Sequence, residues 1–311
     1  MIARYAHLHT FPRVFLSLTG LRLAEFDDLA ETVLLTYASR EADRHARPDR
    51  QRAAGGGHPF SLDARDQLLL TLVWLRQYPT HEVLGFLFGI SDSTVSRITA
   101  RLLPVLADAG QATMRMPDPG RKHRRQFDEL VRDLPELFVV IDSFEQRVQR
   151  PENRAEADTW YSGKKKMHTI KSQVVINGHT GEICDIAESV KGPTADITLL
   201  EDSQVLDRVP EGVGAEGDLA YVGIAKLHPQ GLGATPRRKP RGQDRPPEDV
   251  AYNTAFSRRR IEVEHTIGRM RRYQAITQPD RQHRQGHTER VRAIGGLVNR
   301  QLHQRQLALA A

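Results

Sequence analysis

The sequence has a single cysteine, Cys184, among its 311 residues. One cysteine excludes an internal disulfide and a cysteine-based zinc site within the chain. Long apolar runs are missing as well, because none approaches the roughly 18 residues of a membrane-spanning helix. The first residues, MIARYAHLHTF, lack the apolar stretch of a secretory signal. We therefore expect a cytoplasmic protein without a membrane partner.

Positive charge, by contrast, is concentrated at one end of the chain, which as a whole has a formal net charge of +6. From Arg237 to the C-terminus, 17 Lys and Arg face 7 Asp and Glu, a net charge of +10. Residues 1–236 have 28 basic and 32 acidic side chains, a net charge of −4. A basic end on a balanced body indicates a polyanionic partner such as nucleic acid, and a solvated arginine-rich surface is the alternative.

Residues 62–106 have the spacing of a helix-turn-helix. A first helix is expected to begin after Ser61 as its cap. Further on, Gly85 is small enough to let two helices cross closely, and Gly89 tolerates the positive φ of a tight turn. Ser91 can then cap the second helix of the motif.

The outward face of that second helix carries Ser93, Thr94 and Arg97. In a DNA-binding helix-turn-helix, such polar side chains reach base edges or phosphates. An ordinary helical hairpin is the alternative, and the full spacing favours DNA binding.

From Leu137 onward the pattern changes from helices to strands. The apolar run LFVVI ends at Asp142, two strands are expected to be joined by a turn within residues 177–181, and a further short strand ends at Asp218. Helices follow these strands, which indicates an α/β fold with a mixed sheet flanked by helices. The predicted organisation is a helical DNA-binding domain over residues 1–110, a linker over 111–136 and a catalytic domain over 137–311.

Asp142 and Asp218 both follow apolar strands, where a buried strand is expected to meet solvent. A carboxylate in that position has a desolvation cost unless a positive group compensates for it. Mg²⁺ or Mn²⁺ would compensate, because such ions prefer carboxylate oxygens, and two of them can stabilise the attacking and leaving oxygens of phosphoryl transfer. The sequence therefore predicts a two-metal site that needs a further acid.

The helix expected over residues 257–272 offers Glu262 and Glu264 as that acid. Two residues apart on a helix, they point about 200° apart, so only one can face the sheet. Glu264 shares a face with Ile261 and Ile267, and we expect this apolar face to pack on the domain. Glu264 is therefore the expected third ligand, and Glu262 is expected to pair with arginines in solvent.

Basic residues lie near the predicted acids. Four lysines lie just before or within a long strand: Lys164, Lys165, Lys166 and Lys171. They are expected to clamp the DNA backbone, with a solvated hairpin tip as the alternative. Arg260 and Arg271 share a helix face with Glu264 and are expected to hold the phosphates being cut, unless they form salt bridges with Glu264.

Five stretches of the chain together resemble DDE transposases of the IS5-like group, the DDE superfamily endonuclease type with an attached helix-turn-helix. The stretches are GFLFGISDSTVSRI, VVIDSFEQRVQRP, YSGKKKMHTIKSQVVI, GDLAYVG and RRRIEVEHTIGRMRR. The last is the most specific, because the family has Arg, three residues, Glu, six residues, then Lys or Arg. Arg260, Glu264 and Arg271 match that pattern.

The resemblance implies an RNase H-like catalytic fold, with Asp142 on the first strand, Asp218 after the fourth and Glu264 on a late helix. It also implies the transposase of a bacterial insertion sequence, acting on double-stranded DNA at terminal inverted repeats and at a target site. We expect Asp142 to bridge two metal ions, with Asp218 completing the coordination of one ion and Glu264 that of the other. We also expect a homodimer on DNA.

The chain departs from the family pattern at three positions near the predicted site. Ser143 stands where glycine is usual, Ser257 where tyrosine is frequent, and Ala195 where a histidine commonly precedes Asp196. None of these changes removes a predicted metal ligand. The alternative function is that of a decayed or domesticated transposase, which binds a specific DNA sequence without cutting it.

Overall fold

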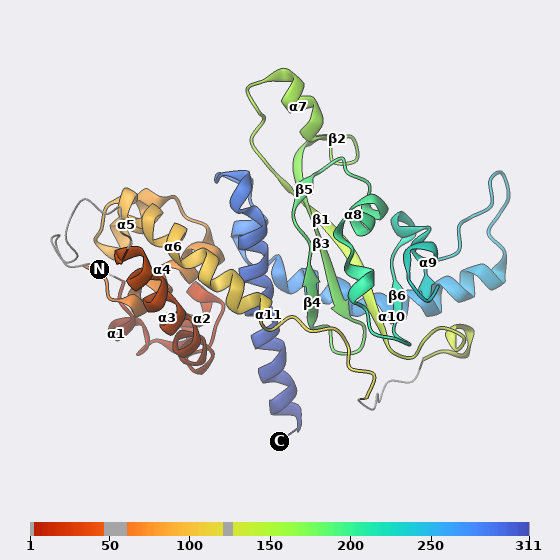
Figure 1. The fold of residues 1–311 in the computed structure, drawn as a ribbon, viewed down its shortest axis with the longest axis horizontal. Helices are drawn as coiled ribbons and strands as arrows, with labels where there is room; N and C mark the ends of the chain where they lie inside the picture. Colours follow the sequence, from red (N-terminus) through yellow and green to blue (C-terminus); the bar gives the residue numbers. More distant parts are fainter. Residues whose placement is uncertain (1–2, 47–60, 121–126, 311) are drawn as a thin grey trace.

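The computed structural model of the protein describes residues 3–46, 61–120 and 127–310. A group of N-terminal helices and a curved sheet with flanking helices lie on opposite sides of the last helix, α11 (His287–Ala310), as Figure 1 shows. One apolar core continues from the helices into one face of the sheet. The domain boundaries at residues 110 and 136 therefore stay predictions. Within the described ranges, no helix is both long and apolar enough to cross a membrane.

The N-terminal group is entirely helical. Its helices are α1 (Tyr5–Leu8), α2 (Pro12–Thr19), α3 (Leu23–His45), α4 (Ala64–Gln77), α5 (His81–Phe88) and α6 (Asp92–Gln111). The predicted cap of α4 is wrong, because Asp63 and not Ser61 accepts a hydrogen bond from the first turn, at 2.7 Å from the Asp66 nitrogen. Asp63 is the better acceptor because a carboxylate also favours the positive end of the helix dipole.

The turn between α5 and α6 has the predicted helix-turn-helix geometry. Gly89 has φ +67°, and a Cβ added to Gly85 would lie 2.6 Å from the Ile90 carbonyl oxygen. Only glycine fits both positions without strain or a clash. Ser91 caps α6 by accepting from the Thr94 N–H at 3.2 Å, as predicted.

A mixed sheet forms the centre of the second group. Its strands are β1 (Phe138–Arg147), β2 (Tyr161–Ser162), β3 (Met167–Asn177), β4 (Ile183–Ile186), β5 (Val190–Lys191), β6 (Gly214–Glu216) and β7 (Gly233–Ala234). Along the order β2-β3-β1-β6-β7, β3 runs antiparallel to β1 and β2, whereas β6 runs parallel to β1 and β7. The other helices are α7 (Arg154–Trp160), α8 (Asp196–Ser203), α9 (Ile224–Leu227) and α10 (Pro247–Met270). The predicted fold class, helices followed by a mixed sheet with flanking helices, is confirmed.

Two adjacent glycines let α11 fit between the sheet and the N-terminal helices. A Cβ added to Gly295 would lie 2.5 Å from Ile186 Cδ1 on β4. A Cβ added to Gly296 would overlap the Cα of Gly110 on α6, so the two helix backbones touch at this crossing. Close packing on both sides therefore depends on the missing side chains.

We expect Gly296→Ala to lower the free energy of unfolding by about 1–3 kcal/mol, because the added methyl meets backbone atoms that cannot move separately. The matched control is Gly268→Ala on α10, where an added Cβ would meet no described atom within 4 Å. That exposed change should stabilise by about 0.4–1 kcal/mol. Urea denaturation of both variants checks the difference, and equal stability of the two would contradict the backbone contact.

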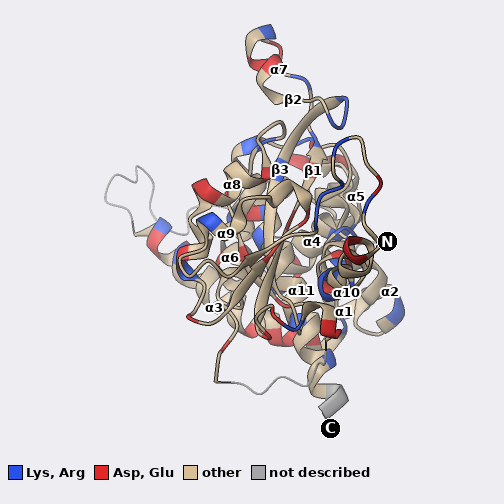
Figure 2. Ribbon diagram, turned by 90° about the vertical axis from the view of Figure 1, so that its right-hand side faces the viewer, with Lys and Arg blue, Asp and Glu red and all other residues tan. Residues whose placement is uncertain are grey.

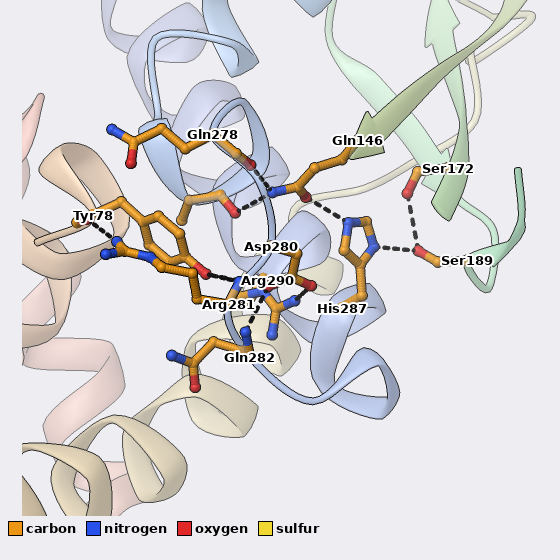
Figure 3. Close-up of polar contacts among 11 residues, drawn as sticks. Tyr78, Gln146, Ser172, Ser189, Gln278, Asp280, Arg281, Gln282, His287 and Arg290 are labelled. Atoms are coloured by element: carbon orange, nitrogen blue, oxygen red, sulfur yellow. Dashed lines mark hydrogen bonds and ion pairs between the residues drawn. The ribbon is translucent and has the colours of Figure 1, made fainter. Parts of the chain in front are cut away.

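His287, the first residue of α11, is a buried histidine inside a hydrogen-bonded chain (Figure 3). Its Nδ1 lies 2.8 Å from Ser189 Oγ and its Nε2 lies 2.8 Å from Gln146 Oε1. Burial and, to a smaller extent, the nearby positive charge of Arg290 lower the pKa of His287 to about 3. The folded protein therefore keeps this imidazole neutral at physiological pH.

Since the unfolded chain protonates His287 below about pH 6.5 and the folded chain does not, stability is lost as the pH falls from 6.5 toward 3. From pH 7.5 to 5.5, this histidine should account for a loss of about 1.4 kcal/mol. Urea denaturation at the two pH values should show a correspondingly smaller loss in His287→Gln. An equal loss in both proteins would mean that His287 is charged when folded.

Candidate active site

The strand register brings Asp142 and Asp218 to the same part of the sheet. Val140 of β1 lies opposite Glu216 of the parallel strand β6. Each aspartate comes two residues later in its own chain segment, so the two lie beside each other where β6 ends. The Asp218 carboxylate also accepts a hydrogen bond from the Ala220 N–H at 2.8 Å, which fixes the turn after β6.

Asp142 does not end its strand, which corrects the expectation that it lies where β1 meets solvent. β1 continues to Arg147 and pairs with β3 beyond Asp142. Side chains alternate between the two faces of a strand. The neighbours on the same face, Val140 and Phe144, belong to the same apolar cluster as Val263 of α10. Asp142 therefore faces the side of the sheet that α10 covers.

Negative charge accumulates around Asp142. Burial raises the pKa of the Asp142 carboxyl, and the neighbouring carboxylates of Asp218 and Asp196 raise it further. Two groups act in the opposite direction: the Ser143 N–H donates to Asp142 Oδ1 at 2.7 Å, and Arg260 contributes positive charge. The raised pKa means that these groups do not fully offset burial and repulsion, so a divalent cation between the two paired aspartates fits the site.

Asp196 is a site residue that the sequence analysis missed as a functional group. It is the first residue of α8, and its Oδ1 accepts a hydrogen bond from Ser143 Oγ at 2.6 Å. The same oxygen lies 3.0 Å from Lys171 Nζ. The available signal was the serine beside Asp142, where a hydroxyl in a half-buried position needs a partner.

The predicted contact between Lys171 and DNA is contradicted by the burial of this side chain. Lys171 is 5% exposed, pairs with Asp196 and donates to the Thr194 carbonyl oxygen at 2.5 Å. A buried ammonium that is already paired cannot reach a DNA backbone without breaking these bonds. Lys171 instead holds the start of α8 against β3.

Lys164, Lys165 and Lys166 are all exposed, in the turn between β2 and β3. Figure 1 and Figure 2 show that β2 and α7 form an arm that extends from the rest of the sheet. Arg284 contacts α7 of this arm, where it pairs with Glu156 at 2.6 Å and stacks on Trp160. The exposed position leaves the DNA-clamp prediction open for these three lysines.

The inward face of α10 differs from the expected one. Ile261 is 39% exposed, and Glu264 and Arg271 are exposed as well. The buried side chains on this helix are Ala255, Phe256, Arg259, Val263, Thr266, Ile267 and Met270. The prediction that Ile261 packs inward is wrong because a buried arginine shifts the contact face.

That arginine is Arg259, which the sequence analysis did not single out. Its guanidinium pairs with Glu216 at 2.7 Å, donates to the Pro135 carbonyl oxygen at 2.6 Å and lies 4.0 Å from the centre of the Phe138 ring. Both charged side chains are almost fully buried. The pair fixes α10 beside β6, two residues before Asp218.

The placement of α10 determines the surroundings of Arg260, Glu262 and Glu264. Arg260 is half-buried, and its Nε has no hydrogen-bond partner among the described residues. Glu264 comes four residues later and so lies on the same side of the helix. Glu262 is half-buried rather than in solvent, 3.8 Å from the Nδ1 of His265. Across the described ranges, no three acidic, histidine or cysteine side chains are grouped closely enough to hold a metal ion.

The α6 residues predicted to touch DNA lie at the start of the helix. Ser93 and Arg97 are exposed and Thr94 is half-buried. The Arg97 guanidinium donates to the Ser93 carbonyl oxygen at 3.1 Å and to Thr94 Oγ1 at 3.2 Å. These contacts hold the arginine along the helix surface, and among the described residues no other hydrogen bond uses its remaining donors.

Comparisons with known proteins agree with both parts of this description. The family described as DDE superfamily endonuclease matches residues 141–299, and the helix-turn-helix of DDE superfamily endonuclease matches residues 60–112. The probable transposase for insertion sequence element IS702 of Microchaete diplosiphon is 28% identical over 254 residues, which cover 82% of this chain and 86% of that protein. No solved structure matches the chain significantly.

The first match includes the sheet with both aspartates, α10 and about half of α11, and the second includes α4, α5 and α6. The mixed sheet with its flanking helices is thus the RNase H-like nuclease fold, preceded by a DNA-binding motif. The chain belongs to the DDE superfamily endonucleases.

Proposed function

We propose that the protein is the transposase of a bacterial insertion sequence of the IS5-like group, which binds inverted-repeat ends and then cuts and joins DNA strands. The observation that carries the proposal is the placement of Asp142 beside Asp218, with Arg260 close enough to affect the Asp142 pKa. A helix-turn-helix in the same chain supplies a means of selecting DNA. The probable IS702 transposase, as a relative, supports this class of activity.

Asp142 and Asp218 are the proposed ligands of Mg²⁺ or Mn²⁺, with Glu264 as the third ligand and two ions in total. Carboxylate oxygens suit these ions, and the excess negative charge around Asp142 favours a cation there. Glu264 is supported by its position one helical turn after Arg260. When bound, the ions supply positive charge that stabilises the attacking and leaving oxygens of phosphoryl transfer.

The remaining residues are proposed to hold DNA. Arg260 has an Nε–H free among the described contacts, which suits a phosphate oxygen next to the acids. Arg271, exposed near the end of α10, would take a phosphate further along the strand. Ser93, Thr94 and Arg97 would read the end sequence from the major groove.

The proposed partners follow from the reaction. Transposition joins two ends of one element to a target site, so we propose that a homodimer holds terminal inverted repeats and target DNA together. The reaction takes place where the bacterial chromosome lies, so we propose a cytoplasmic location.

A non-catalytic, sequence-specific DNA-binding protein is the second candidate. One observation favours it: the described residues include no group of three side chains placed to hold a metal ion, and Glu264 is exposed. A decayed or domesticated transposase would bind ends through α6 and leave them uncut.

Asp142→Asn should reduce Mg²⁺-dependent cleavage of a plasmid that carries the gene and its flanking DNA by at least about a thousandfold, because it removes a charged metal ligand. Binding of the same DNA ends should stay unchanged, since α6 belongs to the N-terminal helices on the other side of α11 from the sheet (Figure 1). Asp202→Asn, at an exposed site on α8, is the control and should cut normally. Metal-dependent cutting by Asp142→Asn would refute the site, and no cutting by any of the three proteins would favour the second candidate.

Replacing Lys164, Lys165 and Lys166 together with alanine should weaken non-specific DNA binding. The slope of log K against log salt concentration should fall by about 0.9 for each phosphate that the protein no longer neutralises. Lys226→Ala, at an exposed position on α9, is the control and should leave the slope unchanged. Equal slopes for all three proteins in fluorescence-anisotropy titrations would identify the arm as a solvated tip.

A further inference from the structure

The helix-turn-helix is attached to the catalytic sheet at a second place besides the α6–α11 crossing. Tyr78 caps the C-terminal end of α4, in the short connection to α5, and has the uncommon positive φ of 51° while it is 2% exposed. Its hydroxyl accepts from the Arg281 N–H at 3.0 Å and donates to Asp280 Oδ1 at 3.1 Å. The Arg281 guanidinium donates to the Tyr78 carbonyl oxygen and lies over the Tyr78 ring (Figure 3).

Asp280 carries this attachment to the end of β1. Its Oδ1 accepts the hydrogen bond from the tyrosine hydroxyl, and its Oδ2 pairs with the buried guanidinium of Arg290. Its backbone N–H donates to the Arg147 carbonyl oxygen at 2.7 Å, and it forms a parallel bridge with Val148. One buried residue therefore joins the two parts, with its carboxylate bonded to Tyr78 on the helix-turn-helix side and its backbone bonded to the end of the strand that carries Asp142. Removing either partner of such a buried ion pair lowers the stability of the fold, because it leaves an uncompensated buried charge.

Gln146 lies on the same face of β1 as Asp142. It forms a second link between β1 and the segment that follows α10, and its hydrogen bonds determine which nitrogen of His287 carries the proton. Its amide nitrogen donates to the carbonyl oxygens of Ala275 at 3.0 Å and Gln278 at 2.6 Å. Its Oε1 is then the acceptor, so the Nε2 of neutral His287 must be the donor in that contact. Nδ1 of His287 consequently accepts from Ser189 Oγ.

Ser189 in turn connects His287 to the next strand, β3. Ser189 gives its only hydroxyl proton to His287, so the Ser172 hydroxyl of β3 must donate to Ser189 Oγ at 2.9 Å. Every donated proton in this series of hydrogen bonds, from Ser172 on β3 to the segment after α10, therefore has one consistent position. A fully satisfied buried network of this kind rigidifies the elements that it joins.

The Tyr78 contacts add directional hydrogen bonds to the apolar packing that joins the helix-turn-helix side to the sheet. The backbone contact of Gly110 with Gly296 fixes a crossing point near the end of α6, within the shared apolar core. The Tyr78 hydrogen bonds lie at the other end of the motif, before α5, next to the Arg76 guanidinium of α4, which lies over the Tyr273 ring. Hydrogen bonds have preferred directions that apolar packing lacks, so the Tyr78 contacts favour one orientation of the motif relative to β1.

We infer that Tyr78, Asp280 and Gln146 are positioning residues that set the orientation of the DNA-reading helix against the catalytic strand. They thereby determine which phosphodiester bond, counted from the bound end sequence, is presented to Asp142. The inference about cut position rests on the proposed function. The inference about orientation does not, and each has its own measurement.

Orientation is tested in the absence of DNA. Spin labels on Glu82→Cys of α5 and Glu201→Cys of α8, both exposed positions, report the distance between the two parts, while the buried Cys184 stays unlabelled. We expect a narrow distance distribution that becomes broader with Tyr78→Phe, which keeps the ring and removes two hydrogen bonds. Tyr161→Phe, at an exposed tyrosine on β2, should not broaden it. An unchanged distribution in Tyr78→Phe would overturn the inference.

Cut position is tested by mapping the broken bonds at nucleotide resolution on a labelled DNA end. The wild-type protein and Tyr161→Phe should cut at one bond. Tyr78→Phe and Arg281→Lys should spread the cuts over neighbouring bonds while their affinity for the end stays the same. A merely stabilising role would lower the yield without moving the cuts, so cuts at the unchanged single bond would overturn the assignment. No cutting by the wild-type protein would instead refute the proposed function, and the distance distributions would then decide the inference about orientation.

Discussion

The contact of α6 and α11 at Gly110 and Gly296 is the constraint on which the arrangement of the molecule depends. Because the two backbones touch, α11 can lie against the N-terminal helices on one side and, through Gly295, against β4 on the other. The apolar core then runs without interruption from the helix-turn-helix to one face of the sheet. A motif that selects DNA and a sheet that carries the acidic pair are thus built on one shared helix.

Buried charges do the remaining positioning, and each is paired. The ion pair of Arg259 with Glu216 fixes α10 beside β6. That of Arg290 with Asp280 fixes the segment before α11 beside the end of β1. Such pairs contribute little net stability, but breaking one leaves an uncompensated buried charge, so they select one arrangement over its alternatives. Around Asp142 the arrangement differs, because its neighbours Asp218 and Asp196 are carboxylates that raise its pKa further. The structural pairs join a carboxylate to a guanidinium, whereas the acidic pair places two carboxylates side by side.

Local chemistry made much of the fold predictable. Gly85, Gly89 and Ser91 have narrow conformational roles, so the helix-turn-helix followed from them directly, and apolar runs between turn residues identified the long strands. Contacts between distant segments were not predictable. Lys171 looked like a surface lysine because Asp196, which neutralises it, lies 25 residues later in the sequence. The contact face of α10 was misjudged because apolar periodicity cannot indicate that Arg259 is buried by Glu216. The neighbourhood of Asp142 and Asp218 was expected from their positions after apolar strands and from the resemblance, and its physical cause, the parallel register of β1 with β6, appeared only in the structure.

Binding of Mn²⁺ in the absence of DNA tests the central claim, the role of the acidic pair, most directly. The decrease of the free-ion paramagnetic resonance signal would be titrated for the wild-type protein, Asp218→Asn and the exposed-site control Asp202→Asn. The account predicts saturable binding to the wild-type protein and the control, and no such binding to Asp218→Asn. Equal Mn²⁺ binding by all three proteins would contradict it, because the ion would then be held by residues other than the pair that β1 and β6 bring together.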